Sequence, residues 1–64
     1  MHQYEIRIAR TTGNPQIVRS RFLGDFHAVR RGEQLAGPDT VLEVWRDEQC
    51  IFRRETLPPG RMAA

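Results

Sequence analysis

Residues 24–38 predict a single short helix at the centre of a chain of only 64 residues. The carboxylate of Asp25 can accept a hydrogen bond from the amides of His27 or Ala28, which is a common way for a helix to begin. At the other end, Gly37 is expected to take the left-handed cap conformation, and the proline after it cannot continue the helix. Since each side of this segment leaves room for only two strands, the layout predicts the order ββαββ.

Alternating apolar residues predict the strands on both sides of the helix. Tyr4, Ile6 and Ile8 fall at every second position with charged residues between them, as in a strand with one buried and one wet face. A run of turn-forming residues at 11–15 then predicts a hairpin loop. The other strands are expected at residues 16–23, 40–46 and 50–55.

The second strand is ambiguous because its apolar residues come in two adjacent pairs, Ile17 with Val18 and Phe22 with Leu23. Neighbouring residues in a strand point to opposite faces, so the two pairs cannot all be buried on one face. A bulge near Ser20 accounts for this pattern, and so does a strand that is covered on both faces.

Helical periodicity divides the central segment into an apolar and a polar side. The apolar side is expected to pack on the sheet through Ala28, Val29, Gly32, Leu35 and Ala36. Gly32 lies in the middle of this side, where the missing side chain favours a close approach of the helix to the sheet. The opposite side carries His27, Arg30, Arg31 and Gln34.

Together these segments predict an α+β fold, a small and mostly antiparallel sheet of three or four strands with one helix packed on one face. We expect residues 1–56 to form a single globular domain and residues 57–64, with two prolines and a glycine, to form a flexible C-terminal tail. Local periodicity leaves the strand order and the hairpin registers open.

A set of short patterns spans about residues 4–55. They are a Tyr-x-Ile-x-Ile strand at 4–8, a turn with Gly13, an Ile-Val pair at 17–18, a helix ending in Leu-Ala-Gly at 35–37 and a Leu-Glu-Val-Trp hairpin segment at 42–45. In these patterns the chain resembles short alphaproteobacterial proteins that form a domain family of unknown function. The resemblance implies the ββαββ order and no particular activity. One departure is the helix start, where those proteins tend to carry an acidic run and this chain has Gly24-Asp25-Phe26-His27.

Charge and cysteine content favour a cytoplasmic protein. The chain has ten arginines, no lysine and eight acidic residues, which gives a net charge of +2. The exclusive use of arginine reflects either GC-rich codons or selection for forked contacts to phosphate and carboxylate. Cys50 is the only cysteine, so no intramolecular disulfide can form, which fits a reducing compartment. The amino-terminal residues lack the apolar run of a secretory signal or a membrane span, so no membrane association is expected.

The sequence predicts no enzymatic activity. A domain of this size has little concave volume, and we expect His27 to be a solvent-exposed side chain and Cys50 a half-buried one. His2, His27 and Cys50 show no recognisable metal-ligand spacing. No metal, cofactor or small-molecule substrate is therefore expected.

Nucleic-acid binding is one of two functions that the sequence leaves open. The polar helix side, defined by His27, Arg30, Arg31 and Gln34, can contact phosphates. Further positive charge comes from Arg19, Arg21, Arg53 and Arg54. The simpler interpretation is a solvated helix side, with the sheet arginines paired to carboxylates. The expected pairs are Arg7 or Arg21 with Glu5, and Arg53 with Glu43.

Protein interaction is the function that we favour from the sequence. One helix covers only one face of a sheet, so apolar residues of the other face stay available to a second copy of the chain or to another protein. These residues are either Val41 and Trp45 or Ile17 and Leu23. This accounts for the two-sided apolar pattern of the second and third strands, which nucleic-acid binding does not. The sequence therefore predicts a small non-enzymatic interaction domain, with contact surfaces at the polar helix side and around Val41 and Trp45.

Overall fold

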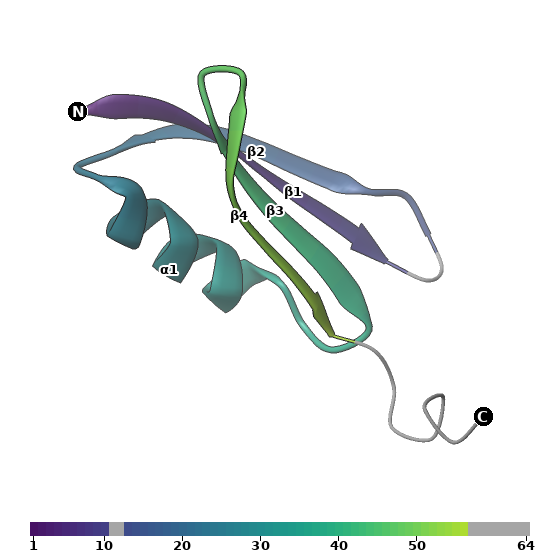
Figure 1. Cartoon of the computed structure of the whole chain (residues 1–64). Coiled ribbons are helices and arrows are strands. Elements are labelled where there is room, and N and C mark those ends of the chain that lie inside the picture. The colour runs from purple at the N-terminus through teal and green to yellow at the C-terminus, as the bar shows by residue number, and fades with distance from the viewer. Residues whose placement is uncertain (11–12, 57–64) are drawn as a thin grey trace.

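In the computed structural model, the chain forms one four-stranded antiparallel sheet with a single helix against it (Figure 1). The structure describes residues 1–10 and 13–56. Its elements are β1 (His2–Arg10), β2 (Gln16–Phe22), α1 (Asp25–Leu35), β3 (Thr40–Arg46) and β4 (Gln49–Thr56). The predicted α+β fold and the ββαββ order are confirmed. Residues 57–64, where we expect a flexible tail, lie outside the described ranges.

The strand order β2-β1-β3-β4 places the first and third strands at the centre of the sheet. β1 pairs with β2 and β3 with β4 as hairpins, and the antiparallel pairing of β1 with β3 joins the two hairpins. Ile6, for example, lies opposite Val18 on one side and Val44 on the other. Figure 1 shows α1 against a single face of the sheet. We call this the helix face and the opposite one the open face.

The core lies between α1 and the two central strands. Its fully enclosed side chains are Tyr4, Ile6, Ile8, Leu42 and Val44 from the sheet and Ala28 from the helix. Gly32 brings the helix backbone close to them, since a Cβ built there would lie 3.0 Å from Cδ1 of Leu42 and 3.4 Å from Cγ2 of Ile6. The close approach expected at Gly32 is thus confirmed.

In the described chain, β2 has no bulge near Ser20 and is not covered on both faces, so neither explanation of its apolar pairs holds. β2 pairs with β1 in an unbroken register, so Val18 lies on the helix face and Ile17 on the open face. The irregularity occurs instead in the second hairpin, next to Trp45 in β3. Ile17 is 52% exposed, whereas Val18 packs against the core. The apolar pair therefore consists of one residue on the helix face and one that the described chain leaves uncovered.

Asp25 does not cap the helix, contrary to the expectation from the sequence. Gly24 precedes the first turn, its carbonyl oxygen accepts from the N–H of Ala28 at 3.2 Å, and no side chain caps this end. The carboxylate of Asp25 turns to the sheet, where Oδ1 accepts from the hydroxyl of Tyr4 at 2.6 Å and from Nη1 of Arg46 at 2.8 Å. Tyr4 is buried and its hydroxyl needs a protein partner, whereas the amides of an exposed helix end can bond to water.

The other end of the helix also differs from expectation. The N–H of Ala36 bonds to the carbonyl oxygen of Gly32 at 2.8 Å, and the backbone then becomes extended. Gly37 does not take the left-handed conformation, and the positive φ falls on Asp39, at 59°. The hydroxyl of Thr40 donates to the carbonyl oxygen of Gly37 at 2.7 Å. This side-chain hydrogen bond closes the connection to β3 in place of a glycine cap.

Two ion pairs tie α1 to the sheet near the two helix ends. Arg46, the last residue of β3, pairs with Asp25 at 2.8 Å, and Arg54 in β4 pairs with Glu33 at 3.2 Å. Because both pairs are partly exposed, they orient the helix more than they stabilise it.

Candidate protein-contact surface

The open face carries three rows of side chains that cross the sheet. The strand registers place Arg19, Glu5, Trp45 and Cys50 in the first row, Ile17, Arg7, Glu43 and Arg53 in the second, and Ala9, Val41 and Glu55 in the third. Positive and negative charges alternate along the second row from Arg7 to Arg53. The third row is apolar in the central strands, where Ala9 lies opposite Val41.

On the β1 and β2 side, two arginines converge on one carboxylate. Nε of Arg19 donates to Oε1 of Glu5 at 3.0 Å, and Arg7 donates to Oε2 of the same residue. Hydrogen bonds from Arg7 and then from Arg19 hold the pKa of the Glu5 carboxyl below its ordinary value. Arg7 is also placed above Trp45, with its guanidinium carbon 4.4 Å from the ring centroid. This stack connects β1 to β3 through a cation–π contact.

On the β3 and β4 side, the polar contacts continue from the same tryptophan. Nε1 of Trp45 donates to Oε1 of Glu43 at 3.0 Å, and Nε of Arg53 donates to Oε2 at 3.3 Å. Arg53 forms a second ion pair with Glu55, and this pair together with the one to Glu43 raises the pKa of the guanidinium. A continuous series of polar contacts thus crosses all four strands, which we call the charge chain. Its members are Arg19, Glu5, Arg7, Trp45, Glu43, Arg53 and Glu55.

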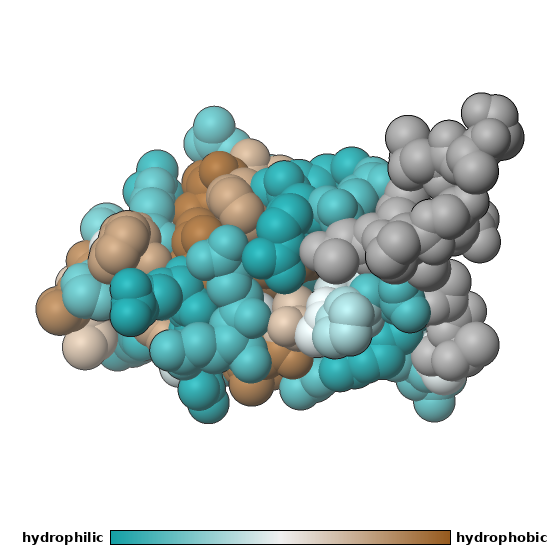
Figure 2. All heavy atoms as spheres, turned by 90° about the horizontal axis from the view of Figure 1, so that it is seen from below, coloured by the Kyte–Doolittle hydropathy of each residue, from teal (hydrophilic) through white to brown (hydrophobic). Residues whose placement is uncertain are grey.

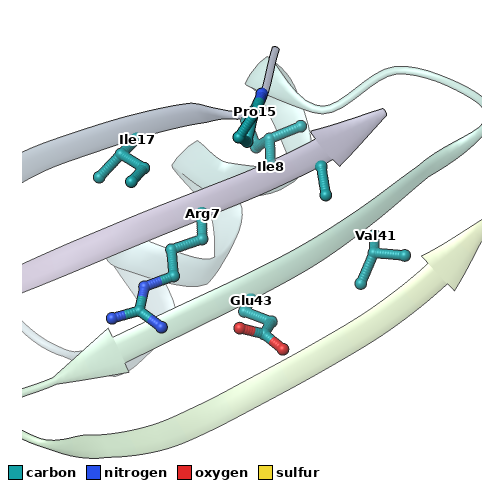
Figure 3. A pocket seen from close by; sticks show the side chains of 7 residues that line it. Arg7, Ile8, Pro15, Ile17, Val41 and Glu43 are labelled. Carbon is teal, nitrogen blue, oxygen red and sulfur yellow. The ribbon is translucent and has the colours of Figure 1, made fainter. Parts of the chain in front are cut away.

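An apolar hollow of about 210 Å³ lies beside the charge chain. Its lining residues are Arg7, Ile8, Ala9, Pro15, Ile17, Val41 and Glu43. Figure 3 shows Arg7, Ile17, Val41 and Glu43 in front of the strands, with the helix behind them. The hollow is partly open to solvent, and it can accept an apolar side chain while its lining offers one guanidinium and one carboxylate.

The polar helix side is exposed, as the sequence predicts. His27, Arg30, Arg31 and Gln34 all face solvent. Nη1 of Arg31 donates to Oε1 of Gln34 at 3.4 Å, a weak contact. The guanidinium of Arg30 lies 6.0 Å from the ring centroid of Phe26, which is 69% exposed. Phe26 is a surface residue that the sequence analysis did not single out, although its position outside the apolar arc of the helix was a usable signal.

Figure 2 views the molecule from below with respect to Figure 1, so that α1 lies toward the viewer. Hydrophilic residues cover much of this side. Apolar residues gather at the left, the end of the molecule where β2 passes into α1, and further groups appear at the upper side left of centre and at the lower edge. Leu23, in that connection, is 69% exposed. The helix side therefore has a polar surface with an apolar margin near the helix start.

The structure separates the predicted site residues into two surfaces. Val41 and Trp45 lie on the open face, half-buried, while the polar helix side faces away from the sheet. Leu23, which was grouped with Ile17, lies outside the sheet and does not join the open face. The stacking of Arg7 on Trp45 was not predictable from the sequence, because the two residues lie on strands more than thirty residues apart in the chain.

The predicted charge pairs are partly correct. Arg53 pairs with Glu43 as expected, and Glu5 pairs with Arg7. The second partner of Glu5 is Arg19, which lies directly opposite it in the hairpin. The unbroken register of β1 and β2 places Arg19 opposite Glu5 and Arg21 opposite Gln3, so Arg21 is not the partner.

The described part of the chain shows no group of three or more residues able to hold a metal ion. Cys50 is exposed, not half-buried as expected, and His27 is exposed as expected. Over the described ranges, no helix has the length and apolar character needed to cross a membrane. No protein-family model, curated protein or solved structure matches the chain.

Proposed function

We propose that this chain is a small, non-enzymatic protein-interaction domain that binds its partner through the open face. One observation carries the proposal: half-exposed apolar residues surround a hollow on a sheet face that no described segment covers. These residues are Ala9, Ile17 and Val41, and Trp45 lies in the first row of the same face. A group of apolar residues gathered on an uncovered sheet face is a common mark of a contact surface.

The charges of the open face favour a protein partner over a nucleic acid. Phosphate binding needs cations whose charge is not already compensated. Arg7, Arg19 and Arg53 each contact at least one carboxylate. A partner that binds here therefore meets a nearly neutral surface of alternating charge, which suits a protein surface of mixed charge.

The exposed thiol of Cys50 fits the same proposal if the domain works in the reducing cytoplasm. Cys50 lies opposite Trp45 at the margin of the open face. In a reducing compartment it can take part in the contact as a small apolar side chain.

Site-specific photocrosslinking in the cells that produce the protein tests this function. A photoreactive amino acid at position 17, beside the hollow, is expected to give covalent adducts with protein. The same residue at position 34, on the polar helix side, is the matched control because Gln34 is equally solvent-facing but lies away from the open face. Equal adduct formation from both positions, or none from position 17, would contradict the proposal.

Nucleic-acid binding through the polar helix side is a second candidate. Among the described residues, Arg30 and Arg31 have no carboxylate within ion-pair distance, and the exposed ring of Phe26 lies next to Arg30. An aromatic ring beside an uncompensated cation is a suitable surface for a base and its phosphate.

An amide-resolved NMR titration with a short random DNA duplex, at low and then near-physiological salt, tests the second candidate. Salt-sensitive shifts at His27, Arg30, Arg31 and Gln34 would support it. The double variant Arg30→Gln, Arg31→Gln is then expected to lose these shifts, whereas Arg53→Gln keeps them. Unmoved signals at low salt rule it out.

A further inference from the structure

The second row of the open face is complementary to itself. Arg7 and Glu43 lie opposite each other in the two central strands, one on each side of the midline of the sheet. Figure 3 shows both side chains on the same face. A two-fold rotation that sets β1 of one copy over β3 of another copy therefore places Arg7 of each copy over Glu43 of the other.

We infer that the open face binds a second copy of this chain, about a two-fold axis that runs parallel to the strands between β1 and β3. This inference rests on the proposed function and names its partner. The axis sets β1 of one copy over β3 of the other. Arg7 then faces Glu43 of the second copy, twice by symmetry, and Ala9 faces Val41 of the second copy.

The alternative axis, parallel to the sheet but perpendicular to the strands, is much less favourable. Passed through the second row, it sets Arg7 on Arg7 and Glu43 on Glu43, so that like charges meet. Passed between the first and second rows, it sets Glu5 over Arg7 but the apolar Ile17 over Arg19. Of the axes compared, only the one along the strands matches both Arg7 with Glu43 and Ala9 with Val41, while it sets Glu5 over Trp45 and Ile17 over Arg53. It also gives the aligned packing that is common between two sheets.

The side chains that would meet have hydrogen-bonding capacity left. The hydrogen bonds of Arg7 in the structure use Nε, toward Glu5, and the two terminal amino groups hold four further donors. Each oxygen of Glu43 accepts one hydrogen bond, from Trp45 or from Arg53, and has a second lone pair. Both side chains therefore keep a donor or an acceptor for a contact between copies.

The size of the face sets the strength of the contact. Four strands about 4.8 Å apart and about seven residues long give a face of roughly 19 by 23 Å, or about 900 Å² buried over both copies. This area is near the lower limit for specific interfaces. The dimer is therefore expected to be weak and to dissociate on dilution.

Charge reversal with complementation tests the inference. Sedimentation equilibrium of the wild type is expected to show a reversible dimer at concentrations up to about 1 mM. Arg7→Glu alone and Glu43→Arg alone each create two like-charge contacts and are expected to weaken the dimer at least about tenfold. In an equimolar mixture, the new carboxylate at position 7 faces the new guanidinium at position 43, and the other contact is the native one. The mixture is expected to restore the dimer.

Arg31→Glu is the matched control, because it reverses a charge on the polar helix side and is expected to leave association unchanged. A second experiment uses only the wild type, so that its result does not depend on the folding of any variant. In a mixture of labelled and unlabelled wild type, isotope-filtered NOEs are expected between the Ala9 methyl of one copy and the Val41 methyls of the other.

A wild type that stays monomeric at about 1 mM overturns the dimer. A dimer that gives none of these NOEs, or folded variants that do not complement each other, overturn the proposed axis. Both results leave the proposed function standing if position 17 still crosslinks to another protein in cells. Absence of crosslinks from position 17 in cells, with a monomer in solution, overturns both.

Discussion

The hydroxyl of Tyr4 donates a hydrogen bond of 2.6 Å to Oδ1 of Asp25, which fastens the buried face of β1 to the first residue of α1. Arg46, at the end of β3, donates to the same oxygen at 2.8 Å. One carboxylate thus joins two strands and the helix. This contact explains why Asp25 leaves its own helix terminus without a side-chain cap.

Removing the hydroxyl with Tyr4→Phe is expected to lower the melting temperature by several degrees, because Asp25 loses a donor while the ring still fills the core. Thermal unfolding followed by circular dichroism measures the change. In a double-mutant cycle, Tyr4→Phe should cost much less when Asp25→Ala is already present, because alanine has no acceptor for the hydroxyl. Additive effects of the two substitutions would show that the hydrogen bond does not couple them.

The same tyrosine is expected to make the protein sensitive to alkaline pH. Burial, and next the hydrogen bond to Asp25, raise the pKa of Tyr4 above its ordinary value of 10.0. A raised pKa favours the protonated phenol in the folded state, so this contribution to stability is complete below about pH 10 and is lost as the pH rises further. Denaturant unfolding at several values between about pH 8 and pH 11 measures this loss of stability. Tyr4→Phe should show a smaller loss of stability above pH 10, and an identical loss would be evidence against this assignment.

Glu5 is expected to make the stability of the fold sensitive to acidic pH. Its pKa lies below the ordinary value of 4.5 because Arg7 and Arg19 donate hydrogen bonds to it. A lowered pKa favours the ionised carboxylate in the folded state, so its contribution is complete above about pH 4.5 and is lost as the pH falls through the folded value. Comparison of the wild type with Glu5→Gln by urea unfolding isolates it from the other carboxylates. The difference in stability between the two should shrink on acidification, and a constant difference would contradict the role of ionisation.

Gly32→Ala is expected to destabilise the domain by about 1 kcal/mol, although alanine is the better helix former by a similar amount. The added methyl group would lie 3.0 Å from Cδ1 of the fully buried Leu42, which has little space to move. Gly37→Ala is the control, because a Cβ there meets nothing within 4 Å. It should be neutral or slightly stabilising. A stabilised Gly32→Ala variant would mean that the core yields to the methyl group.

Neighbouring residues in β3 are expected to respond very differently to truncation. Leu42 is fully buried on the helix face, and Leu42→Ala should cost about 3 kcal/mol, a large part of the stability of so small a domain. Val41 is half-buried on the open face, and Val41→Ala should cost less than about 1 kcal/mol at concentrations where the chain is monomeric. Equilibrium unfolding of both variants measures the contrast. Similar losses would show that the open face is buried in solution.

Most of the fold was predictable from local sequence, and the candidate surface only in part. The alternation of Tyr4, Ile6 and Ile8 determined that β1 has one buried face, and the helical spacing of Ala28 and Gly32 determined which side of α1 packs. Both patterns follow from backbone geometry within a few residues. Val41 and Trp45 were one of two pairs predicted for an uncovered face, because a single helix covers only one face of the sheet.

Tertiary structure decided everything that depends on residues far apart in the chain. The pairing of β1 with β3 sets the strand order, and it alone places Arg7 above Trp45 and opposite Glu43. Asp25 has a cap sequence, yet its partner is Tyr4, 21 residues away. Local preferences of this kind are worth about 1 kcal/mol, so a buried hydroxyl or a strand register can override them. The sequence by itself therefore determined the elements and their buried sides, while long-range packing determined which charges and apolar residues meet on the open face.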